Sequence, residues 1–347
     1  MSIENLKNYY GRILQTSTDL KTTACCLPVA PSPRLQALLS DIHEEVKAKF
    51  YGCGLIAPEA LNGAMILDLG CGAGRDAFLL SRLAGPDGRV TGVDMTREQL
   101  SVARRHVGWH MERYGYDRPN VSFFEGYIEA LEELPLAPGT MDVIVSNCVV
   151  NLSPDKKRVF EQAHRLLKTG GEFYFSDVYA DRRLPIDIQT DPILHAECIG
   201  GALYWNDFLT LAKEAGFRDP RLVTSHEIHI SDPELKARIG EARFFSATYR
   251  LFKLDALEGA CEDYGQGVIY RGGIDGAEDA FVLDAHHRFE AGRVVPVCGN
   301  TLRMIDGTRF APYFEVVGKG DRHYGIFPGC GTAIPFAEGT AAPAACC

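Results

Sequence analysis

The chain has 347 residues, 46% of them hydrophobic, and a formal net charge of −10 at pH 7. This length and composition predict an ordinary globular protein with two or three domains. The negative charge and the absence of a basic run argue against a nucleic-acid partner, because such binding depends on lysine and arginine side chains that neutralise phosphates. A small-molecule substrate is therefore expected.

The sequence shows no sign of a membrane segment or a leader. No run of about 18 apolar residues could span a bilayer, and the start MSIENLKNYYGRIL has no basic region followed by an apolar one. We therefore expect no membrane partner and a cytoplasmic location. In that reducing compartment the eleven cysteines predict metal, redox or catalytic roles rather than a disulfide framework, and their odd number cannot pair completely.

Short apolar runs alternate with helical segments from Met65 onward. The expected strands are MILDLG, RVTGVD, VSFFEG, MDVIVSN and GEFYFSDV. Helices are expected from about Arg75, from about Arg97 to Tyr114 and from about Pro154 to Lys168, with TGG at 169–171 as the stop of the last helix. This alternation predicts an α/β fold, a Rossmann-like, doubly wound, mostly parallel sheet covered by helices on both faces.

Four regions are expected along the chain. Residues 1–45 form an N-terminal helical segment, because SPRLQALLSDIHEEVKAKF carries apolar residues at helical spacing. Residues 46–181 form the Rossmann-like domain. Residues 182–254 form a substrate-binding insertion with the helix WNDFLTLAKEAGF and the strands RLVTSHEIHI and RFFSATYRLFKL. Residues 255–347 are short, Gly-rich segments that predict a small α+β domain, ending in the mobile tail GTAAPAACC.

The segment ILDLGCGAGRD is a glycine loop between the first strand and the following helix. Glycines there allow a tight turn and the close approach of a ligand. Asp94 ends the second strand, where an acid can accept hydrogen bonds from ribose hydroxyls. Dinucleotide enzymes prefer G-x-G-x-x-G, whereas here Asp68 precedes the loop and favours a cationic amino-acid group over a pyrophosphate. A turn without any cofactor is the alternative.

This loop resembles that of class I S-adenosylmethionine-dependent methyltransferases. The resemblance implies that the loop holds the methionine portion and that Asp94 and Met95 hold the ribose and adenine. It also implies that the GYI motif lies at the adenine edge and Asn147 beside the sulfonium. The residues assigned to the cofactor are Asp68, Gly70, Gly72, Gly74, Asp94, Met95, Gly126, Tyr127, Ile128 and Asn147.

Three cysteines adjoin turns or strand ends. Cys148 follows the expected strand MDVIVSN, while Cys53 in FYGCGL and Cys198 in HAECIGGALYW lie in or near glycine-rich sequence. A small buried hydrophobe is the plain interpretation of Cys148. The three are too widely spaced to form the clustered pairs of a structural zinc site, which leaves zinc as a second possibility that needs long-range assembly.

Seven motifs in order resemble arsenite methyltransferases: DLKTTAC, YGCGL, DMT, SNCVVNLSPDK, YFSDVYADR, ECIGGALYW and TYRLFKL, which cover roughly residues 8 to 254. The resemblance implies that Cys53, Cys148 and Cys198 bind trivalent arsenic, joined by an N-terminal cysteine, Cys25 or Cys26. Soft thiolates suit that element. Three sulfurs leave the arsenic lone pair to attack the sulfonium methyl, so no general base is needed. The resemblance also implies a thiol reductant, glutathione or thioredoxin.

Two other functions are compatible with the sequence. One is a class I methyltransferase for a small organic acceptor, with incidental cysteines, and the other is a thiol-based metalloid-binding module with a vestigial glycine loop. The remaining cysteines carry no motif. Cys71 is expected to be a small filler of the glycine loop, and Cys261 and Cys298 are expected to be structural. The tail pair Cys346 and Cys347, like Cys330, is expected to be incidental, with arsenic capture as the alternative.

Overall fold

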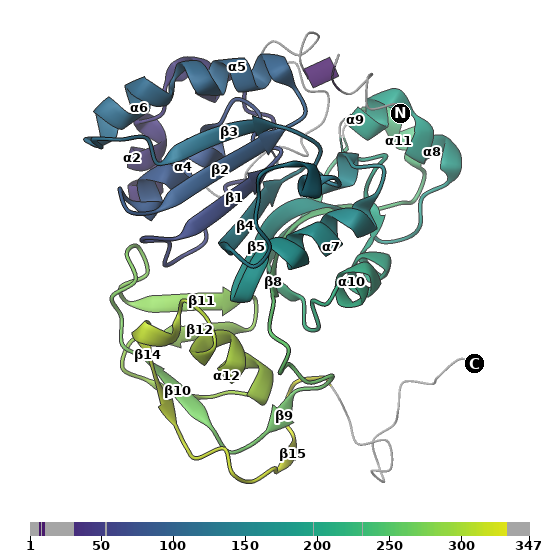
Figure 1. The fold of residues 1–347 in the computed structure, drawn as a ribbon. Coiled ribbons are helices and arrows are strands. Elements are labelled where there is room, and N and C mark those ends of the chain that lie inside the picture. The colour runs from purple at the N-terminus through teal and green to yellow at the C-terminus, as the bar shows by residue number, and fades with distance from the viewer. Residues whose placement is uncertain are drawn as a thin grey trace.

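A central sheet with helices on both faces is followed by a smaller C-terminal domain, as the computed structural model in Figure 1 shows. The structure describes residues 7, 9–10, 31–52, 54–196, 198–230 and 232–331. The strand order of the central sheet is β3-β2-β1-β4-β5-β8-β7, and β6 pairs with β5. Its strands are β1 (Met65–Leu69), β2 (Arg89–Asp94), β3 (Val121–Glu125), β4 (Met141–Asn147), β5 (Leu167–Ala180), β6 (Leu203–Tyr204), β7 (Arg221–Ile228) and β8 (Phe244–Phe252).

The sheet is doubly wound and mostly parallel, which confirms the predicted fold class. Only β8 runs antiparallel, between β5 and β7. Side chains of β1 alternate between two cores, because successive residues of a strand point to opposite faces. Ile66 packs in the core beneath α4 (Arg75–Ala84) and α5 (Arg97–Arg105). Leu67 and Leu69 pack in the core beneath α7 (Lys156–Leu166) and α10 (Trp205–Glu214). Burial on both faces explains why these strands read as nearly continuous apolar runs.

The helices that cover the sheet come from the segments predicted for them. Residues 31–50 form two short helices, and Leu38, Leu39, Ile42 and Val46 join the core on that face. The helices up to β5 are α2 (Pro33–Ser40), α3 (Glu44–Ala48), α4 (Arg75–Ala84), α5 (Arg97–Arg105), α6 (Val107–Tyr114) and α7 (Lys156–Leu166), with the 3₁₀ turns η4 (Leu131–Glu133) and η5 (Val150–Leu152).

The helix predicted from Arg97 to Tyr114 is wrong as a single element. It divides into α5 and α6 at His106, whose backbone leaves the helical region at φ −96° and ψ 4°. Contacts with α3 hold this residue in place. The His106 ring stacks on His43 with centroids 3.7 Å apart, and its Nε2 lies 2.6 Å from an oxygen of Glu45. Tertiary contacts therefore override the local helical pattern.

The prediction that TGG stops the helix before β5 is also wrong. The helix ends at Leu166, and β5 begins at once with Leu167 opposite Met141. Residues 169–171 lie inside the strand, where the register shifts before Val143 meets Glu172. Gly170 has a φ of 82°, and a Cβ there would lie 2.4 Å from the carbonyl oxygen of Gly307. The glycines thus serve a strand irregularity that receives the C-terminal domain.

The segment after β5 folds over the carboxyl-terminal edge of the sheet and then completes the sheet with β7 and β8. Its helices are α8 (Ile186–Thr190), α9 (Pro192–Ala196), α10 (Trp205–Glu214) and α11 (Pro233–Ile239). Cys148 and Leu152 pack with Leu194, Cys198 and Ile199 in a separate apolar cluster. In the described part of the chain, no helix is long and apolar enough to cross a membrane.

The C-terminal domain has its own apolar core and a buried charged contact with the sheet. Its elements are β9 (Glu262–Asp263), β10 (Gly267–Tyr270), β11 (Ala280–Asp284), β12 (His287–Glu290), β13 (Val294–Pro296), α12 (Gly299–Asp306), η6 (Ala311–Tyr313), β14 (Phe314–Val317) and β15 (Gly325–Ile326). Arg250 of β8 is fully buried and forms ion pairs with Glu59 and Glu172. Arg309 of the C-terminal domain pairs with Glu172 and donates to the carbonyl oxygen of Glu59.

His110 makes the stability of the sheet domain depend on pH. Its ring stacks on Phe78 with centroids 3.6 Å apart, its Nδ1 lies 2.7 Å from the carbonyl oxygen of His106, and its Nε2 accepts from the His43 N–H. Burial lowers the pKa of His110 from 6.5 to about 4. Between pH 4 and 6.5 this histidine binds a proton in the unfolded chain but not in the folded one. The contribution of neutral His110 to the free energy of unfolding is therefore fully present above pH 6.5 and is lost as the pH falls toward 4.

We expect the free energy of unfolding to fall by up to about 3 kcal/mol across this window because of His110. Urea unfolding at pH 7, 5.5 and 4.5 measures the change. The variant His110→Gln should show a shallower loss between pH 7 and 4.5 than the unaltered chain, whereas His323→Gln, at a largely exposed position, should not. Equal pH profiles for the unaltered chain and His110→Gln would contradict the assignment.

Candidate active site

The candidate site lies at the carboxyl-terminal edge of three neighbouring strands. β1 pairs in parallel with β2 on one side and with β4 on the other. Asp68 near the end of β1, Asp94 at the end of β2 and Asn147 at the end of β4 therefore reach the same edge. Doubly wound sheets bind their ligands at this edge.

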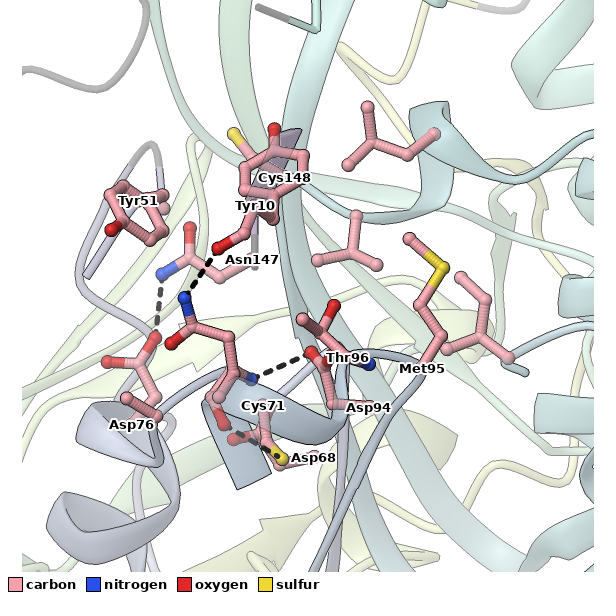
Figure 2. Close-up of a pocket in the computed structure, with 18 of the residues that line it drawn as sticks. Tyr10, Tyr51, Asp68, Cys71, Asp76, Asp94, Met95, Thr96, Asn147 and Cys148 are labelled. Carbon is pink, nitrogen blue, oxygen red and sulfur yellow. Dashed lines mark hydrogen bonds between the residues drawn. The ribbon is translucent and has the colours of Figure 1, made fainter. Parts of the chain in front are cut away.

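A pocket with about 1000 Å³ of empty space, part of it open to solvent, is formed there. A space of this size is typical of sites for cofactors and other small molecules. Figure 2 shows Cys148 at the top of the pocket and Asp68 and Asp94 at the bottom. The lining includes these residues of the predicted set: Asp68, Gly70, Gly72, Asp94, Met95, Gly126, Tyr127, Ile128, Asn147 and Cys148.

The glycines of the loop have different roles. Gly70, Gly72 and Gly74 all have positive φ values, of 71°, 52° and 91°. A Cβ at Gly70 would collide with Val149, and one at Gly74 would crowd Phe123. Gly74 does not line the pocket, so its absent side chain serves packing at the start of α4. Gly72 does line the pocket, and a Cβ there would meet no protein atom within 4 Å.

Asp94 fixes the shape of the loop. Its two carboxylate oxygens accept from the Gly72 N–H at 2.9 Å and from the Thr96 N–H at 2.7 Å. Burial raises the pKa of Asp94, and the two backbone donors oppose that shift. Each carboxylate oxygen can accept a further hydrogen bond, so Asp94 remains able to bind a hydroxyl in the pocket.

Two buried hydrogen-bond acceptor atoms in the pocket lack a donor in the described residues. In the described residues, Asp68 Oδ2 and Asn147 Oδ1 have no hydrogen-bond partner. Asp68 is 2% exposed, and burial together with the charges of Asp76 and Asp94 raises its pKa well above the usual value. A cationic ligand group that donates hydrogen bonds would satisfy both acceptors and favour the Asp68 carboxylate. The pocket therefore fits an amino-acid portion with an ammonium group.

A second layer of charges supports the pocket. Asp76 Oδ2 accepts from Asn147 Nδ2 at 2.7 Å, and Asp76 Oδ1 pairs with Arg75. The Arg75 guanidinium lies over the Phe50 ring, 3.1 Å from its centroid. This arrangement keeps the Asn147 amide in one orientation. Sequence reasoning missed Arg75 and Asp76, although both directly follow the glycine loop.

Residues from the N-terminal segment also reach the pocket. Tyr10 lines the pocket, and its carbonyl oxygen accepts from the Gln99 side chain at 2.8 Å. The Tyr10 ring contacts Tyr51, and Lys7 donates to the Tyr127 hydroxyl at 3.0 Å. No local pattern marks Tyr10 or Gln99 in the sequence, because their contacts join elements about 90 residues apart.

Cys148 and Cys198 are brought together, 50 residues apart in the chain. The Cys198 thiol donates to the Cys148 carbonyl oxygen at 3.3 Å. Their sulfurs and a carboxylate oxygen of Asp177 all lie within 4.8 Å of one another. Both cysteines are 3% exposed. Cys148 lines the pocket, whereas Cys198 does not.

The backbone at both cysteines is strained. Cys148 has a φ of 57° and Cys198 a φ of 64°, and Ala60 is the only other non-glycine residue with positive φ in the described parts of the chain. For a residue with a Cβ this conformation costs about 1–2 kcal/mol. Strain of this kind gathers at functional sites, where other contacts enforce it.

The remaining predicted cysteines, Cys25, Cys26 and Cys53, lie outside the described residues. The neighbours of Cys53 are described. Gly54 accepts from Asn147 Nδ2 at 3.0 Å, and a Cβ at Gly52 would lie 2.6 Å from the Asn147 side chain. Cys148 takes part in a disulfide bond, and no other described cysteine does. Its thiol is therefore in the oxidised form in this structure.

The doubly wound fold and the acidic glycine-loop pocket define a class I S-adenosylmethionine-dependent methyltransferase. The sequence matches the family described as "Methyltransferase domain" over residues 61–216 and the "Arsenite methyltransferase C-terminal domain" over residues 264–331. It is 59% identical over 346 residues to the arsenite methyltransferase of Aquipseudomonas alcaligenes, with 99% of each chain covered. The chain belongs to the arsenite methyltransferase family.

More distant relatives agree with this assignment. The arsenite methyltransferase of Homo sapiens is 45% identical over 322 residues, which cover 92% of this chain and 84% of that protein. A solved structure, an arsenic(III) S-adenosylmethionine methyltransferase from Chlamydomonas reinhardtii, superposes with a TM-score of 0.83 at 48% identity. It covers 86% of this chain and 100% of its own. The family and the cofactor class predicted from the motifs are confirmed.

Gly72 offers a direct test of the cofactor pocket, with Gly63 as a matched control. Both have positive φ, and a Cβ at either position would meet nothing within 4 Å, but only Gly72 lines the pocket. Gly72→Ala and Gly63→Ala should each cost about 1–2 kcal/mol of stability. Only Gly72→Ala should weaken S-adenosylmethionine binding, by at least about tenfold, because the methyl occupies ligand space. Calorimetric titration measures the affinity, and equal affinities for the two variants would contradict the pocket assignment.

Proposed function

We propose that the chain transfers methyl groups from S-adenosylmethionine to trivalent arsenic held by Cys148 and Cys198. The observation that carries the proposal is the left-handed backbone at both cysteines, with their sulfurs close together and Cys148 lining the cofactor pocket. Cys148 comes from the end of β4, and Cys198 comes from the segment 182–254, so the arsenic site joins two regions of the chain. Cys53 and either Cys25 or Cys26 complete the proposed thiol set.

Within the pocket, two groups of residues would bind the two ends of the cofactor. Asp68 and Asn147 would accept hydrogen bonds from the amino-acid portion through their two unsatisfied oxygens. Asp94 and Met95 would hold the ribose and adenine, and residues 126–128 would line the adenine edge. Bound S-adenosylmethionine would supply an electrophilic methyl group on its sulfonium to the arsenic lone pair.

The protein residues at the arsenic site mainly bind and orient. Thiolates hold the soft trivalent element, and three sulfurs leave its lone pair exposed toward the donor. Asp177 is fixed because its oxygens accept from the N–H groups of Asn151 and Val178 at 3.0 and 2.8 Å. Burial in the apolar cluster around Cys148 and Cys198 excludes water from the thiols. Catalysis then rests on near-attack positioning rather than on a general base.

Each methyl transfer raises the formal oxidation state of arsenic by two. Two protein thiolates that form a disulfide return those two electrons to arsenic, and an external dithiol, or two thiols, then reduces the disulfide and leaves as a disulfide itself. The disulfide at Cys148 is the protein form expected at that stage of the cycle. We propose thioredoxin or glutathione as the reductant.

A reducing compartment such as the cytoplasm suits this cycle. Cys71, Cys261, Cys298 and Cys330 all carry free thiols in the described chain. Thiols persist in that state where glutathione and thioredoxin are abundant. The reductant and the location are thus parts of one proposal.

Replacing either cysteine of the described pair should abolish arsenite methylation. Cys148→Ser and Cys198→Ser should each lower kcat/KM by at least about a hundredfold, because a hydroxyl does not hold trivalent arsenic and the acceptor loses its position. Mass spectrometry of the arsenic products, with S-adenosylmethionine and thiol supplied, measures the loss.

Cys330→Ser, in the C-terminal domain, is the matched control and should retain turnover. Affinity for S-adenosylmethionine should remain near that of the unaltered chain in Cys198→Ser, because Cys198 does not line the cofactor pocket. Undiminished methylation by Cys148→Ser or Cys198→Ser would contradict the proposed arsenic site.

Removal of the reductant should change catalytic turnover into a stoichiometric reaction. A fully reduced chain that is mixed with arsenite and S-adenosylmethionine in the absence of thiol should stop after its own thiols are oxidised. Quench-flow measurement of methylated arsenic per chain, together with the Cys148 redox state by thiol mapping, tests this. Continued turnover without any thiol would refute the proposed cycle.

A further inference from the structure

Three cysteines of the C-terminal domain converge on one point. The Sγ atoms of Cys261, Cys298 and Cys330 all lie within 4.8 Å of one another. All three are free in this structure. They are 37 and 32 residues apart in sequence, and no motif marks them, so only the fold assembles them. They belong to the domain below the sheet in Figure 1 and take no part in the methyl-transfer pocket.

Backbone contacts hold the three positions together. β9 pairs with β15, and beyond this pairing the Phe327 N–H donates to the Cys261 carbonyl oxygen at 2.8 Å. The chain then turns, and the Cys330 N–H donates to the Phe327 carbonyl oxygen at 3.4 Å. Cys298 is attached through its neighbour, because the Gln266 side chain donates to the Val297 carbonyl oxygen at 2.6 Å. The cluster is therefore built by pairing that is independent of any ligand.

We propose that Cys261, Cys298 and Cys330 form a second binding site for trivalent arsenic, separate from the site of methyl transfer. The thiol site stands on its own geometry, and the choice of arsenic as its occupant rests on the proposed function.

Three sulfurs match the coordination of trivalent arsenic. The element binds three thiolates and keeps its lone pair, so the site needs no fourth ligand. A structural zinc site is almost always four-coordinate, and no histidine or carboxylate completes the group among the described residues. For comparison, zinc–sulfur bonds of about 2.3 Å in a tetrahedral site place sulfurs about 3.8 Å apart. Cys261 and Cys330 are partly exposed, so small rotations of their side chains can close the remaining distance.

The surroundings of Cys298 favour a bound thiolate. Cys298 is the N-cap of α12, where its Sγ accepts from the Thr301 N–H at 3.5 Å and lies 3.3 Å from the Thr301 hydroxyl. Helix N-termini stabilise thiolates. Binding of a thiophilic ligand would replace the thiol protons and offset the cost of burial.

A path leads from solvent to the cluster. A second pocket, with about 520 Å³ of empty space that is partly open to solvent, lies between α10 and the C-terminal domain. Its lining includes Cys261, Asn300, Lys213 and Arg218. Cys261 therefore faces an opening, whereas Cys298 is 1% exposed and does not line it. A small arsenical can enter at Cys261 and reach the deeper thiol by exchange.

The test uses the full chain carrying Cys148→Ser and Cys198→Ser, so that the proposed catalytic site cannot hold arsenic through these two thiols. The reduced protein is incubated with arsenite alone, freed of excess, and treated with N-ethylmaleimide before peptide mapping. Arsenite should slow the labelling of Cys261 and Cys330 together by at least tenfold. X-ray absorption at the arsenic edge should show three sulfur neighbours.

Single changes in that background identify the third ligand. Cys298→Ser should abolish the protection of Cys261 and Cys330. Serine is also a good helix N-cap, so α12 should remain folded in this variant, and circular dichroism checks this. Cys330→Ser should remove the protection of Cys261 in the same way, without touching the helix. Cys71→Ser, a buried free thiol in the sheet domain, is the matched control and should leave the protection unchanged.

Three outcomes would overturn the proposal: protection unaffected by Cys298→Ser, purified protein whose three thiols already hold zinc, or a disulfide between Cys261 and Cys330 in place of arsenic binding. Methylation by the unaltered chain is measured in parallel. Protection of this thiol cluster without any methylation would refute the proposed function and leave the second site intact. Methylation without protection of the thiol cluster would refute the second site and leave the proposed function intact.

Discussion

The parallel pairing of β1 with β2 and β4 is the constraint on which the site depends. It aligns the ends of three strands, so that Asp68, Asp94 and Asn147 reach one edge of the sheet. The loops that follow these strands can then place backbone N–H groups, glycines without side chains and Cys148 around the same pocket. Because each strand is buried on both faces, a shift of register would move apolar side chains out of two cores at once, which keeps the edge in place.

The electrostatics of the pocket and the strain at the cysteines follow from this arrangement. Asp68 is buried with one oxygen unpaired, and the neighbouring charges of Asp76 and Asp94 raise its pKa further, so a cationic ligand would stabilise its carboxylate. Cys148 must turn sharply at the end of β4, and its N–H still donates to the Ser176 carbonyl oxygen, which continues the pairing with β5. The sheet thus enforces the left-handed backbone that sets the thiol at the rim.

Local sequence signals predicted the sheet and the glycine loop, because alternating apolar runs and a Gly-rich turn are short-range patterns. They failed where distant contacts decide. His106 breaks a regular helical pattern through contacts with α3, and Gly170 serves the approach of Gly307 rather than a helix end. Tyr10 and the cluster around Cys298 leave no local trace, since their partners are far away in sequence. The proximity of Cys148 to Cys198 was accessible only through the family resemblance, because spacing alone gives no reason for it.

The buried Arg250 has a consequence for how the chain can be divided. Its guanidinium is sealed between the last strands of the sheet and the C-terminal domain, where Glu172 is shared with Arg309. A shortened protein that ends near residue 254 would leave Glu172 with one cation fewer and open the apolar surface around Phe252 to water. Uncompensated buried charge of this kind costs about 3–5 kcal/mol. The two parts, though visibly distinct in outline, behave as one cooperative body, and work on an isolated catalytic fragment would start from a weakened molecule.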